Sequence, residues 1–509
     1  LCVLAVRLPR LLEAVSHNSD AISPAVLSET RGPGATVLGD ISYLTTLGFD
    51  WLTSAAPDHR ALWALAPYVL SLVGSGFIAW GAWRVGGRWA CGLTFALSVA
   101  TSPAVLLVQL APAFHGTTVF TTALLGAVLL WLVERPRLAM GARVALIAGI
   151  AIVAGANLAA DPLLAPAALA PFALAPFLIR PAPEGVRALR VTCVVSAALS
   201  VAVGAALLAG LAAVSITPRR LVSGHGNYFD LVTVGQLRQR PDEILQGTLA
   251  LLGPSAFTGA ILAVIAVLLP VVYRRAAVAL QRDVTVRDLS ARGYQLFWIL
   301  SATLVIAAAA LSGSVSSEGT AGDRARYLAP VFFGLAALAG AWAARATARR
   351  VSVALAATLY LSVSILALVR GDMVRLVEHG QLSRYDPALR AWLSARSLEH
   401  GYAGYWDANV LRYEARLPVS PVVQCDSGAT RVLCPDRLNA RSTWFAPSDA
   451  TRSFLVVDPT PGGSHVVSTL PPRAVFGAPL TGARFGPVSV WVYPYDLASR
   501  LSGPWSVRG

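Results

Sequence analysis

The sequence predicts a polytopic α-helical membrane protein with about eleven transmembrane helices, the first of them truncated, and a C-terminal extracytoplasmic α/β domain. Three observations lead to this fold class. Hydrophobic residues make up 55% of the 509 positions and charged residues only 13%, about half the share of an ordinary soluble domain. Apolar stretches of about 20 residues, enough to cross a hydrocarbon core, recur through residues 1–370. Beyond them, in residues 371–509, polar segments alternate with short β-type runs.

The apolar runs give the predicted helices in order. The run that starts at Leu1 has only about a dozen residues and is typical of the tail of a first spanning helix, with a cleaved signal peptide as the alternative. Every later run is long enough to cross a bilayer as a helix. The predicted helices span residues 62–83, 89–111, 117–133, 144–160, 163–179, 191–216, 247–273, 295–312, 327–344 and 351–369.

Arginine clusters occupy alternate connections between these helices, which predicts the orientation. By the positive-inside rule, the side that carries them is the cytoplasm. The other side then receives the first outer loop, residues 17–60, and the domain 371–509. We therefore expect a multi-pass protein of the inner (plasma) membrane with its C-terminal domain outside. The clustered residues are Arg84, Arg88, Arg135, Arg137, Arg143, Arg180, Arg187, Arg190, Arg274, Arg275, Arg282, Arg287, Arg292, Arg345, Arg349 and Arg350.

The net charge of +14 could indicate nucleic-acid binding. The arginines, however, lie in short clusters between apolar runs, where anchoring to membrane lipids explains them better. We therefore expect membrane lipids, and not nucleic acid, among the partners. The sequence also lacks a P-loop, a paired CxxC motif, an HExxH motif and a dinucleotide fingerprint between a strand and a helix.

The C-terminal segment carries its own structural signals. Asp386 and Pro387 are typical of a helix start. The runs 452–458 and 488–493, bounded by proline and glycine, are typical of strands. Cys425 and Cys434 flank a short polar loop, where a disulfide would add roughly 2–3 kcal/mol of stability. Such a bond requires an oxidising compartment, in agreement with the predicted orientation.

Three residues in outer segments could take part in chemistry. Asp20 follows the first helix closely, as a general base for a hydroxyl near the membrane surface would; alternatively, it is a solvated loop acid or a helix cap. Asp161, followed by Pro162, could be a second carboxylate at the reaction centre, or the N-cap of the next helix. His115 lies at an outer turn and could orient a phosphate or a substrate hydroxyl, or be a plain interfacial residue. We treat Asp161 and His115, together with His225 in the outer loop 217–246, as candidates for a substrate or metal site.

Basic residues on the same side could bind an anion. Arg324 and Arg326 lie at the outer end of a late helix, and arginine matches phosphate oxygens in bidentate geometry. The alternative is snorkelling to lipid headgroups. Arg219, Arg220 and His225 lie in the outer loop 217–246, which could close over a lipid phosphate or could be an ordinary surface loop.

This layout resembles that of the C-type integral membrane glycosyltransferases. The similar features are an acid in the first outer loop, an interfacial segment at residues 39–44, many further helices, an outward soluble domain, and the short stretches 323–330 and 401–409. The resemblance implies a polyprenyl-phosphate-linked sugar donor, a glycan, lipid or protein acceptor, inversion at the anomeric carbon, and Asp20 as catalytic base. Asp20 is not followed by a second acid, as it is in some branches of the family, so a divalent metal ion stays an open candidate cofactor.

Two other function classes compete with this interpretation. A transporter or lipid flippase would place ionisable residues or broken helices near the bilayer midplane. Here the acids and arginines gather at the outer edge, which favours chemistry at the interface. A non-catalytic envelope-assembly protein is the third hypothesis, since a fold can persist after its activity is lost. The presence of Asp20 weighs against it.

Overall fold

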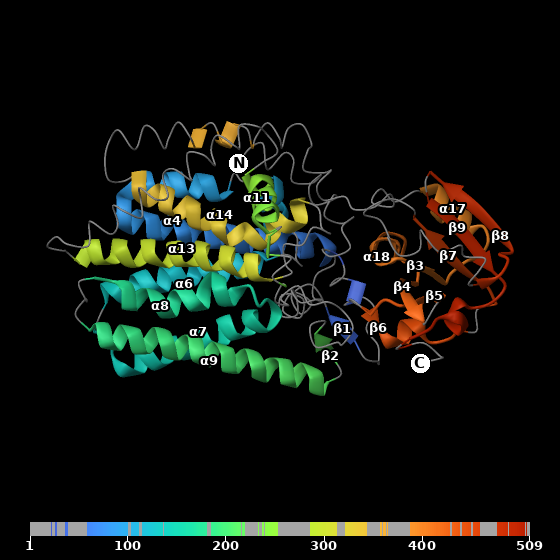
Figure 1. The fold of residues 1–509 in the computed structure, drawn as a ribbon, viewed down its shortest axis with the longest axis horizontal. Coiled ribbons are helices and arrows are strands. Elements are labelled where there is room, and N and C mark those ends of the chain that lie inside the picture. The colour runs from blue at the N-terminus through green and yellow to red at the C-terminus, as the bar shows by residue number, and fades with distance from the viewer. Residues whose placement is uncertain are drawn as a thin grey trace.

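The computed structural model contains a helical bundle and, beside it, a sheet-rich C-terminal domain (Figure 1). The described residues are 22, 26–27, 36–38, 59–99, 103–110, 115–135, 137–180, 185–214, 216–218, 233, 237–238, 240–252, 286–312, 321–343, 357–358, 360–362, 364, 387–427, 430–437, 440–448, 451–458, 476–486, 488–503 and 505.

The bundle agrees with most of the predicted spans. Five of its segments are long and apolar enough to cross a membrane: Pro67–Val99, Gly116–Glu134, Met140–Ala160, Val186–Ala213 and Asp288–Leu311. The predicted span 247–273 and the tail at Leu1 lie largely or wholly outside the described residues, as does most of 351–369. The helices are α4 (His59–Val99), α5 (Pro103–Leu110), α6 (Gly116–Glu134), α7 (Met140–Ala160), η1 (Ala165–Leu169), α8 (Ala170–Leu178), α9 (Val186–Ala213), α11 (Arg240–Leu252), α13 (Val286–Leu311) and α14 (Ala321–Ala343).

Gly87 divides α4 into two crossings. At 1.5 Å per residue, a straight helix of this length would be about 60 Å long, twice the hydrocarbon thickness. Gly87 has φ 77°, a conformation that glycine adopts without strain. Arg84, three residues before Gly87, pairs with Glu134 at the end of α6. Val108, on the following helix α5, lies near the start of α6, where its carbonyl oxygen would be 3.0 Å from a Cβ added to Gly116. The chain therefore reverses at residues 84–88, where the sequence predicts the connection.

Aromatic residues of α13 fill the centre of the bundle against glycines of its neighbours. Phe297 and Trp298 are buried. A Cβ added to Gly126 of α6 would lie 2.9 Å from the Phe297 ring, and one added to Gly334 of α14 would lie 3.5 Å from the Trp298 ring. Helices in a bilayer associate through close packing, because lipid tails are as apolar as their side chains. These glycines therefore bring α6 and α14 close to α13.

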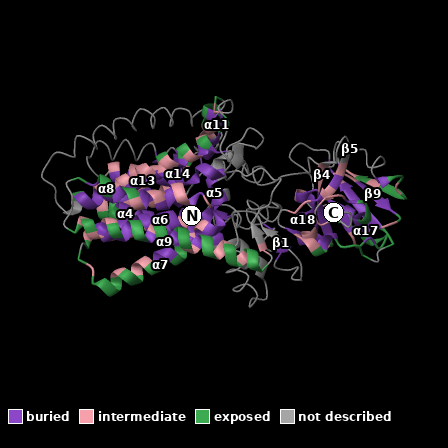
Figure 2. Ribbon diagram, turned by 60° about the horizontal axis from the view of Figure 1, so that its bottom comes forward, coloured by how far each residue is buried: buried purple, intermediate pink, exposed green. Residues whose placement is uncertain are grey.

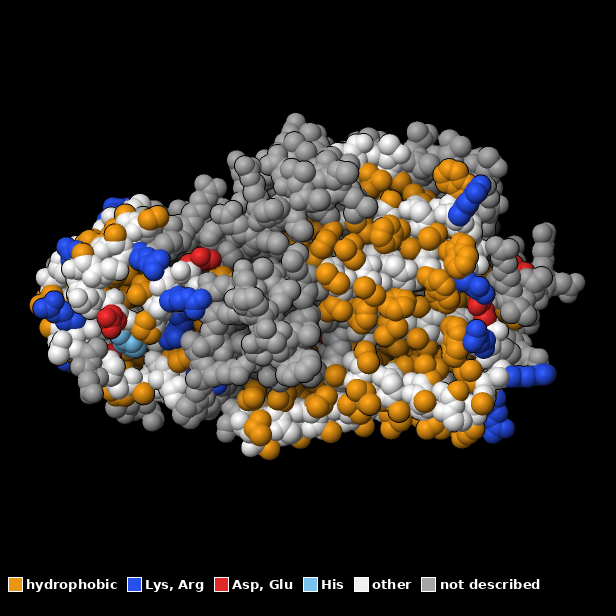
Figure 3. Space-filling model, turned by 180° about the vertical axis from the view of Figure 1, so that it is seen from behind, with side chains coloured by type: hydrophobic (Ala, Val, Ile, Leu, Met, Phe, Trp, Pro, Cys, Tyr) orange, Lys and Arg blue, Asp and Glu red, His pale blue; other side chains and the backbone are white. Residues whose placement is uncertain are grey.

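The pair α7 and α9 forms one outer layer of the bundle. Gly155 of α7 approaches the backbone of Ser200 on α9, where an added Cβ would lie 2.7 Å from the carbonyl oxygen. Away from this contact both helices expose apolar residues (Figure 2). The exposed set includes Val144, Ile152, Val153, Val191, Val194, Val195, Leu199 and Val201. Figure 3 shows the apolar surface that the bundle presents, as a helix in contact with lipid requires.

Arginines gather at the end of the bundle that lies away from the C-terminal domain (Figure 3). There Arg84 Nη2 lies 2.7 Å from Glu134 Oε2. Arg292 donates to the carbonyl oxygen of Arg180. Connections far apart in the sequence thus meet at one end, as the sequence predicts for one side of the membrane.

The C-terminal domain is built on a six-stranded sheet with the order β5-β4-β3-β7-β9-β8. The central strand β3 is parallel to β4 and β7, and the outer pairs are antiparallel. The runs 452–458 and 488–493 form strands as predicted, and the predicted helix begins at Pro387. The elements are α17 (Pro387–Ser394), β3 (Gly401–Ala403), α18 (Tyr405–Ala415), β4 (Val419–Ser427), β5 (Thr430–Pro435), η5 (Ser442–Phe445), β7 (Ser453–Val457), β8 (Thr481–Phe485), β9 (Val488–Tyr493) and η6 (Leu497–Arg500).

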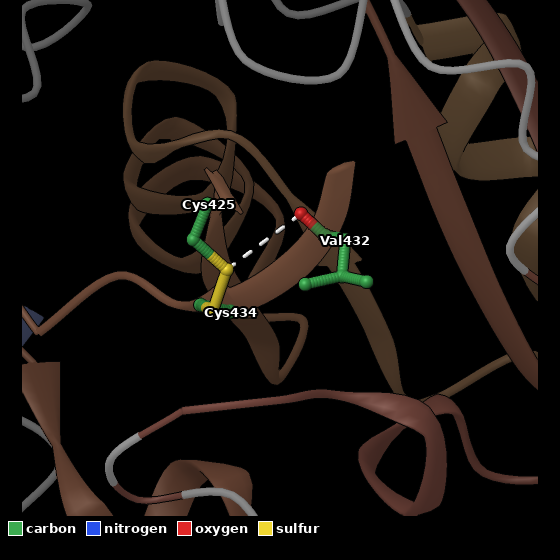
Figure 4. Close-up of a disulfide and its surroundings, with 3 residues drawn as sticks. All are labelled: Cys425, Val432 and Cys434. Atoms are coloured by element: carbon green, nitrogen blue, oxygen red, sulfur yellow. Dashed lines mark hydrogen bonds between the residues drawn. A yellow bond between two sulfur atoms is a disulfide. The ribbon is translucent and has the colours of Figure 1, made fainter. Parts of the chain in front are cut away.

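A disulfide joins the edge strand β5 to its neighbour β4 in this sheet (Figure 4). Cys425 lies on β4 opposite Val432, and Cys434 lies on β5 opposite Val423. Their Cα atoms are 6.0 Å apart. The bond therefore ties the hairpin diagonally across its two strands, at the pair of cysteines that the sequence singles out.

A second, three-stranded sheet joins three distant parts of the chain. Its order is β2 (Ile216–Pro218), β1 (Thr36–Leu38) and β6 (Ala440–Arg441), with β1 parallel to β2 and antiparallel to β6. In the same region Ile22, Val26 and Leu27 are buried within a hydrophobic cluster of the C-terminal domain. Residues 36–38 and 216–218 therefore lie beside the C-terminal domain.

A hydrogen-bond network around Asp496 fixes the end of the C-terminal domain. Tyr402 donates to Asp496 Oδ1 over 2.6 Å, and the Ser448 amide and hydroxyl donate to Oδ2. His400 Nε2 lies 3.0 Å from the Tyr402 hydroxyl. Burial alone would raise the pKa of Asp496, but these hydrogen bonds outweigh it and hold that pKa below its ordinary value. Burial lowers the pKa of His400, and the charge of Asp496 opposes this shift only in part.

The tight contact between α7 and α9 predicts a position-specific loss of stability. Gly155→Val should lower the free energy of unfolding by about 1–3 kcal/mol, because the new side chain must displace Ser200 or Val203. Gly149→Val on the same helix is the matched control, since nothing lies within 4 Å of its Cβ position. Unfolding of both variants in detergent measures the difference. Equal stabilities would contradict the described packing.

The network at Asp496 predicts how stability depends on pH. A histidine with a lowered folded-state pKa stabilises the fold above its unfolded value of about 6.5, and that contribution is lost as the pH falls below it. The free energy of unfolding of the C-terminal domain should therefore fall between pH 7 and pH 5, by no more than about 1.4 kcal/mol per pH unit for this group. His400→Gln should flatten that slope in denaturant titrations of the full chain. The Asp496 contribution is present above about pH 3.9 and is lost as the pH falls through its lower folded-state pKa. A slope between pH 7 and pH 5 that survives His400→Gln would contradict this assignment.

Candidate functional site

The two outer turns predicted to carry chemistry meet inside the bundle. His115 precedes the first residue of α6, and Asp161 follows the last residue of α7. His115 Nδ1 lies 2.7 Å from Asp161 Oδ2, and both side chains are 0% exposed. Because α6 and α7 run in opposite directions, the start of one lies beside the end of the other. The pair lies at the end of the bundle opposite its cluster of arginines.

Three donors surround the Asp161 carboxylate. Oδ2 accepts from His115 Nδ1 and from the Thr118 hydroxyl, and Oδ1 accepts from the Leu163 amide over 3.0 Å. The last bond spans the turn that leads to η1, and the role of Asp161 at a reaction centre stays a prediction. A buried carboxylate needs such partners, because it has left water.

A polar side chain from the middle of the bundle extends this cluster. Asn157, one helical turn before Asp161, donates to the carbonyl of Thr117 and to the Thr121 hydroxyl, each over 2.7 Å. The Thr118 hydroxyl also lies 3.3 Å from Asn157 Oδ1. The polar residues of α6 and α7 therefore form one network, which holds His115 and Asp161 at fixed positions.

Tyr327 connects this network to the arginine of α14. Its ring centroid lies 4.8 Å from that of His115. Tyr327 also contacts Arg326, whose Cζ lies 5.1 Å from the Tyr327 ring centroid and whose Nη2 lies 3.4 Å from the Tyr327 hydroxyl. Arg326 is 8% exposed. A histidine, a tyrosine and an arginine thus adjoin one another at the end of the bundle opposite its cluster of arginines.

The remaining predicted residues fall into three groups. Asp20, Arg219, Arg220 and His225 lie outside the described residues, and their roles stay predictions. Arg324 lies on α14, two residues before Arg326. Cys425 and Cys434 form their disulfide in the C-terminal domain and belong to no site at the membrane.

Metal binding stays an open prediction. Among the described residues, no three histidine, cysteine, aspartate or glutamate side chains converge as metal ligands would. His115 and Asp161 form a pair, and the other partners of Asp161 are a threonine hydroxyl and a backbone amide. Those two groups donate hydrogen bonds to the carboxylate.

Sequence reasoning missed Thr118 and Asn157. Asn157 lies inside a predicted spanning helix, where a polar residue is costly and needs a partner. That signal alone marks it as a candidate. Thr118 has no such signal, because a threonine near the start of a helix is common. Only its position one turn from His115 brings it to Asp161.

Thr118 and Thr122 provide a matched test of the network. Thr118→Val removes a donor from a buried carboxylate and should lower the free energy of unfolding by about 1–3 kcal/mol. Thr122→Val should cost less, because its hydroxyl bonds only the Thr118 carbonyl of its own helix. Unfolding in detergent compares the two variants. A larger loss for Thr122→Val would contradict the network.

No family model and no curated protein sequence matches this chain. Among solved structures it is similar to ArnT from Cupriavidus metallidurans, crystallised with undecaprenyl phosphate, with 15% sequence identity and a TM-score of 0.50. The match covers 99% of this chain and 98% of the ArnT chain. At this identity the similarity concerns the fold. The chain therefore has the fold of ArnT, which confirms at the level of fold the resemblance to the C-type integral membrane glycosyltransferases.

Proposed function

We propose that this protein is a membrane glycosyltransferase that moves a hexose or pentose from a polyprenyl-phosphate-linked donor to an acceptor hydroxyl on the outer face, for the synthesis of a cell-envelope glycan or glycoprotein. The observation that carries the proposal is the similarity in fold to ArnT over almost the whole of both chains. The ArnT structure holds undecaprenyl phosphate. A buried polar cluster at the edge of a membrane bundle suits a ligand with an anionic head and a long isoprenoid tail.

The orientation follows from charge and from the disulfide. The arginine-rich end of the bundle is the cytoplasmic end by the positive-inside rule. The opposite end, with His115, Asp161 and the C-terminal domain, then faces outward. The disulfide Cys425–Cys434 supports this orientation, since such bonds persist in oxidising compartments.

Asp20 is the proposed catalytic base, which takes the proton of the acceptor hydroxyl. Support comes from Ile22, which is buried in a hydrophobic cluster of the C-terminal domain. Ile22 is two residues beyond Asp20 in the sequence. Leu27 is held there as well, because its carbonyl oxygen accepts from Arg441 Nη2 over 3.1 Å. In this arrangement the C-terminal domain presents the acceptor to the base.

The donor phosphate is proposed to bind at Arg326, with Arg324, Arg219 and Arg220 as further candidates. Arg326 adjoins Tyr327 at the outer end of the bundle. Arginine binds phosphate oxygens well where water is scarce. Positive charge at this place stabilises the negative charge that develops on the departing phosphate.

An apolar groove between α6 and α7 offers room for an isoprenoid chain. The groove holds about 270 Å³ and is lined by residues that include Leu124, Leu125, Leu146 and Ile150. Thr121 marks its polar end, where the hydroxyl accepts from Asn157. The groove thus runs from the buried polar network along the surface of α6, in the direction that a lipid tail would take from its phosphate.

The decisive test is sugar transfer by the protein and its Asp20→Asn variant. Loss of a general base should lower transfer by at least about a hundredfold. Membranes with matched amounts of each protein receive radiolabelled polyprenyl-phosphate sugars, and transfer to endogenous acceptor is counted. Asp242→Asn, a change at an exposed acid of α11, serves as control and should transfer normally. Equal transfer by Asp20→Asn would refute its role, and no transfer from any donor would favour the flippase, transporter or assembly alternatives.

A further inference from the structure

His115 has one ring nitrogen that the fold does not use. Nδ1 is engaged by Asp161, whereas Nε2 is buried and makes no hydrogen bond within the part of the chain that the structure describes. Leaving a buried nitrogen without a partner is costly, so such atoms call for an explanation. The contact that holds α6 to α7 requires Nδ1 only. The Nε2 position is therefore available to a ligand.

Asp161 determines what Nε2 can do. The carboxylate only accepts hydrogen bonds, so Nδ1 must carry a proton. Nε2 is then either a bare lone pair or, in the protonated ring, a second N–H donor. The Asp161 carboxylate accepts from Nδ1 in both forms of the ring, as in the aspartate–histidine pairs of hydrolases. With Asp161 in place, His115 can therefore present an N–H at Nε2 and give up that proton during a reaction.

The groups next to His115 favour an anion as the ligand. The Tyr327 ring centroid lies 4.8 Å from that of His115, and the Arg326 Cζ lies 5.1 Å from that same tyrosine ring centroid. The negative charge nearest to His115, on Asp161, is already bound by three donors. An N–H donor at Nε2 and a guanidinium that contact the same tyrosine suit a phosphate better than a neutral hydroxyl.

We propose that His115 is a catalytic residue that donates Nε2–H to the phosphate leaving group, with Asp161 as its positioning residue. This deepens, and rests on, the proposed glycosyl transfer. The acceptor oxygen forms a bond to the anomeric carbon as its proton passes to Asp20. The bond between that carbon and the phosphate oxygen breaks, and its electron pair stays on the oxygen. His115 gives its Nε2 proton to the phosphate, which leaves as polyprenyl phosphate monoester, and the ring regains a proton from water.

Two substitutions separate the two nitrogens of His115. Asparagine places its amide nitrogen near the position of Nδ1, so His115→Asn keeps a donor toward Asp161 and loses Nε2. Glutamine places its amide nitrogen near the position of Nε2, so His115→Gln has the opposite effect. If His115 is purely structural, His115→Gln should have the larger effect on unfolding, on ligand binding and on sugar transfer. If His115 donates to a phosphate, His115→Asn should have the larger effect on ligand binding alone.

The experiment measures binding of undecaprenyl monophosphate to the purified full chain in nanodiscs, with undecaprenol as the phosphate-free control, alongside thermal unfolding and sugar transfer. His115→Asn should bind undecaprenyl monophosphate at least about tenfold more weakly than wild type, as loss of a charge-assisted hydrogen bond requires, with unfolding nearly unchanged. His115→Gln should recover part of that binding although it unfolds at a lower temperature. Asp20→Asn should bind it as wild type does.

The outcomes distinguish this inference from the proposed function. If the wild type transfers sugar and His115→Asn binds undecaprenyl monophosphate as tightly as the wild type does, the role of His115 is overturned. The glycosyltransferase assignment then stays intact. Weaker binding by His115→Gln than by His115→Asn would also overturn it, in favour of a structural contact. Absence of transfer in the wild type, with phosphate binding that still depends on His115, would refute the proposed function and keep the phosphate site.

Discussion

The structure depends on how closely its helices can approach one another in the bilayer. Lipid tails compete with side chains for every apolar surface, so only close packing and internal hydrogen bonds hold helices together. Here the distances between helices are set by glycines, with Gly155 against α9 and Gly126 against the Phe297 ring. The same packing aligns the start of α6 with the end of α7. The buried pair of His115 and Asp161 exists because those two helix ends are level with each other.

Much of the bundle could be predicted from the sequence, because a bilayer demands long apolar runs. The spans at 117–133 and 144–160 match α6 and α7 to within a few residues at each end. The turn before residue 89 matches Gly87. The strands of the small outer sheet could not be predicted. A three-residue strand such as Thr36–Leu38 shows no alternation, and its partners are 216–218 and 440–441, far away in sequence.

The sequence marks the individual residues of the candidate site, but it does not predict that they lie together. Outer turns mark His115 and Asp161 separately, yet their contact depends on the register between α6 and α7, which no local pattern contains. The two oxygens of Asp161 have different partners, with the Leu163 amide at Oδ1 and His115 at Oδ2, and only the first contact is local in sequence. Tyr327 lies within a stretch that resembles the family, but its ring contact with His115 follows from tertiary packing alone.

The outer sheet β2-β1-β6 carries a consequence for biogenesis. Strand β1 leaves the ribosome early, but its partner β6 follows roughly 400 residues later, after all the described spans of the bundle. At about 5–20 residues per second, roughly 20–80 s of synthesis separate the two strands. During that interval β1 has an unpaired edge, which other chains can bind. Completion of this face is therefore one of the last steps of assembly, and a ribosome that stalls before residue 440 leaves an inserted bundle with its outer loops unfastened.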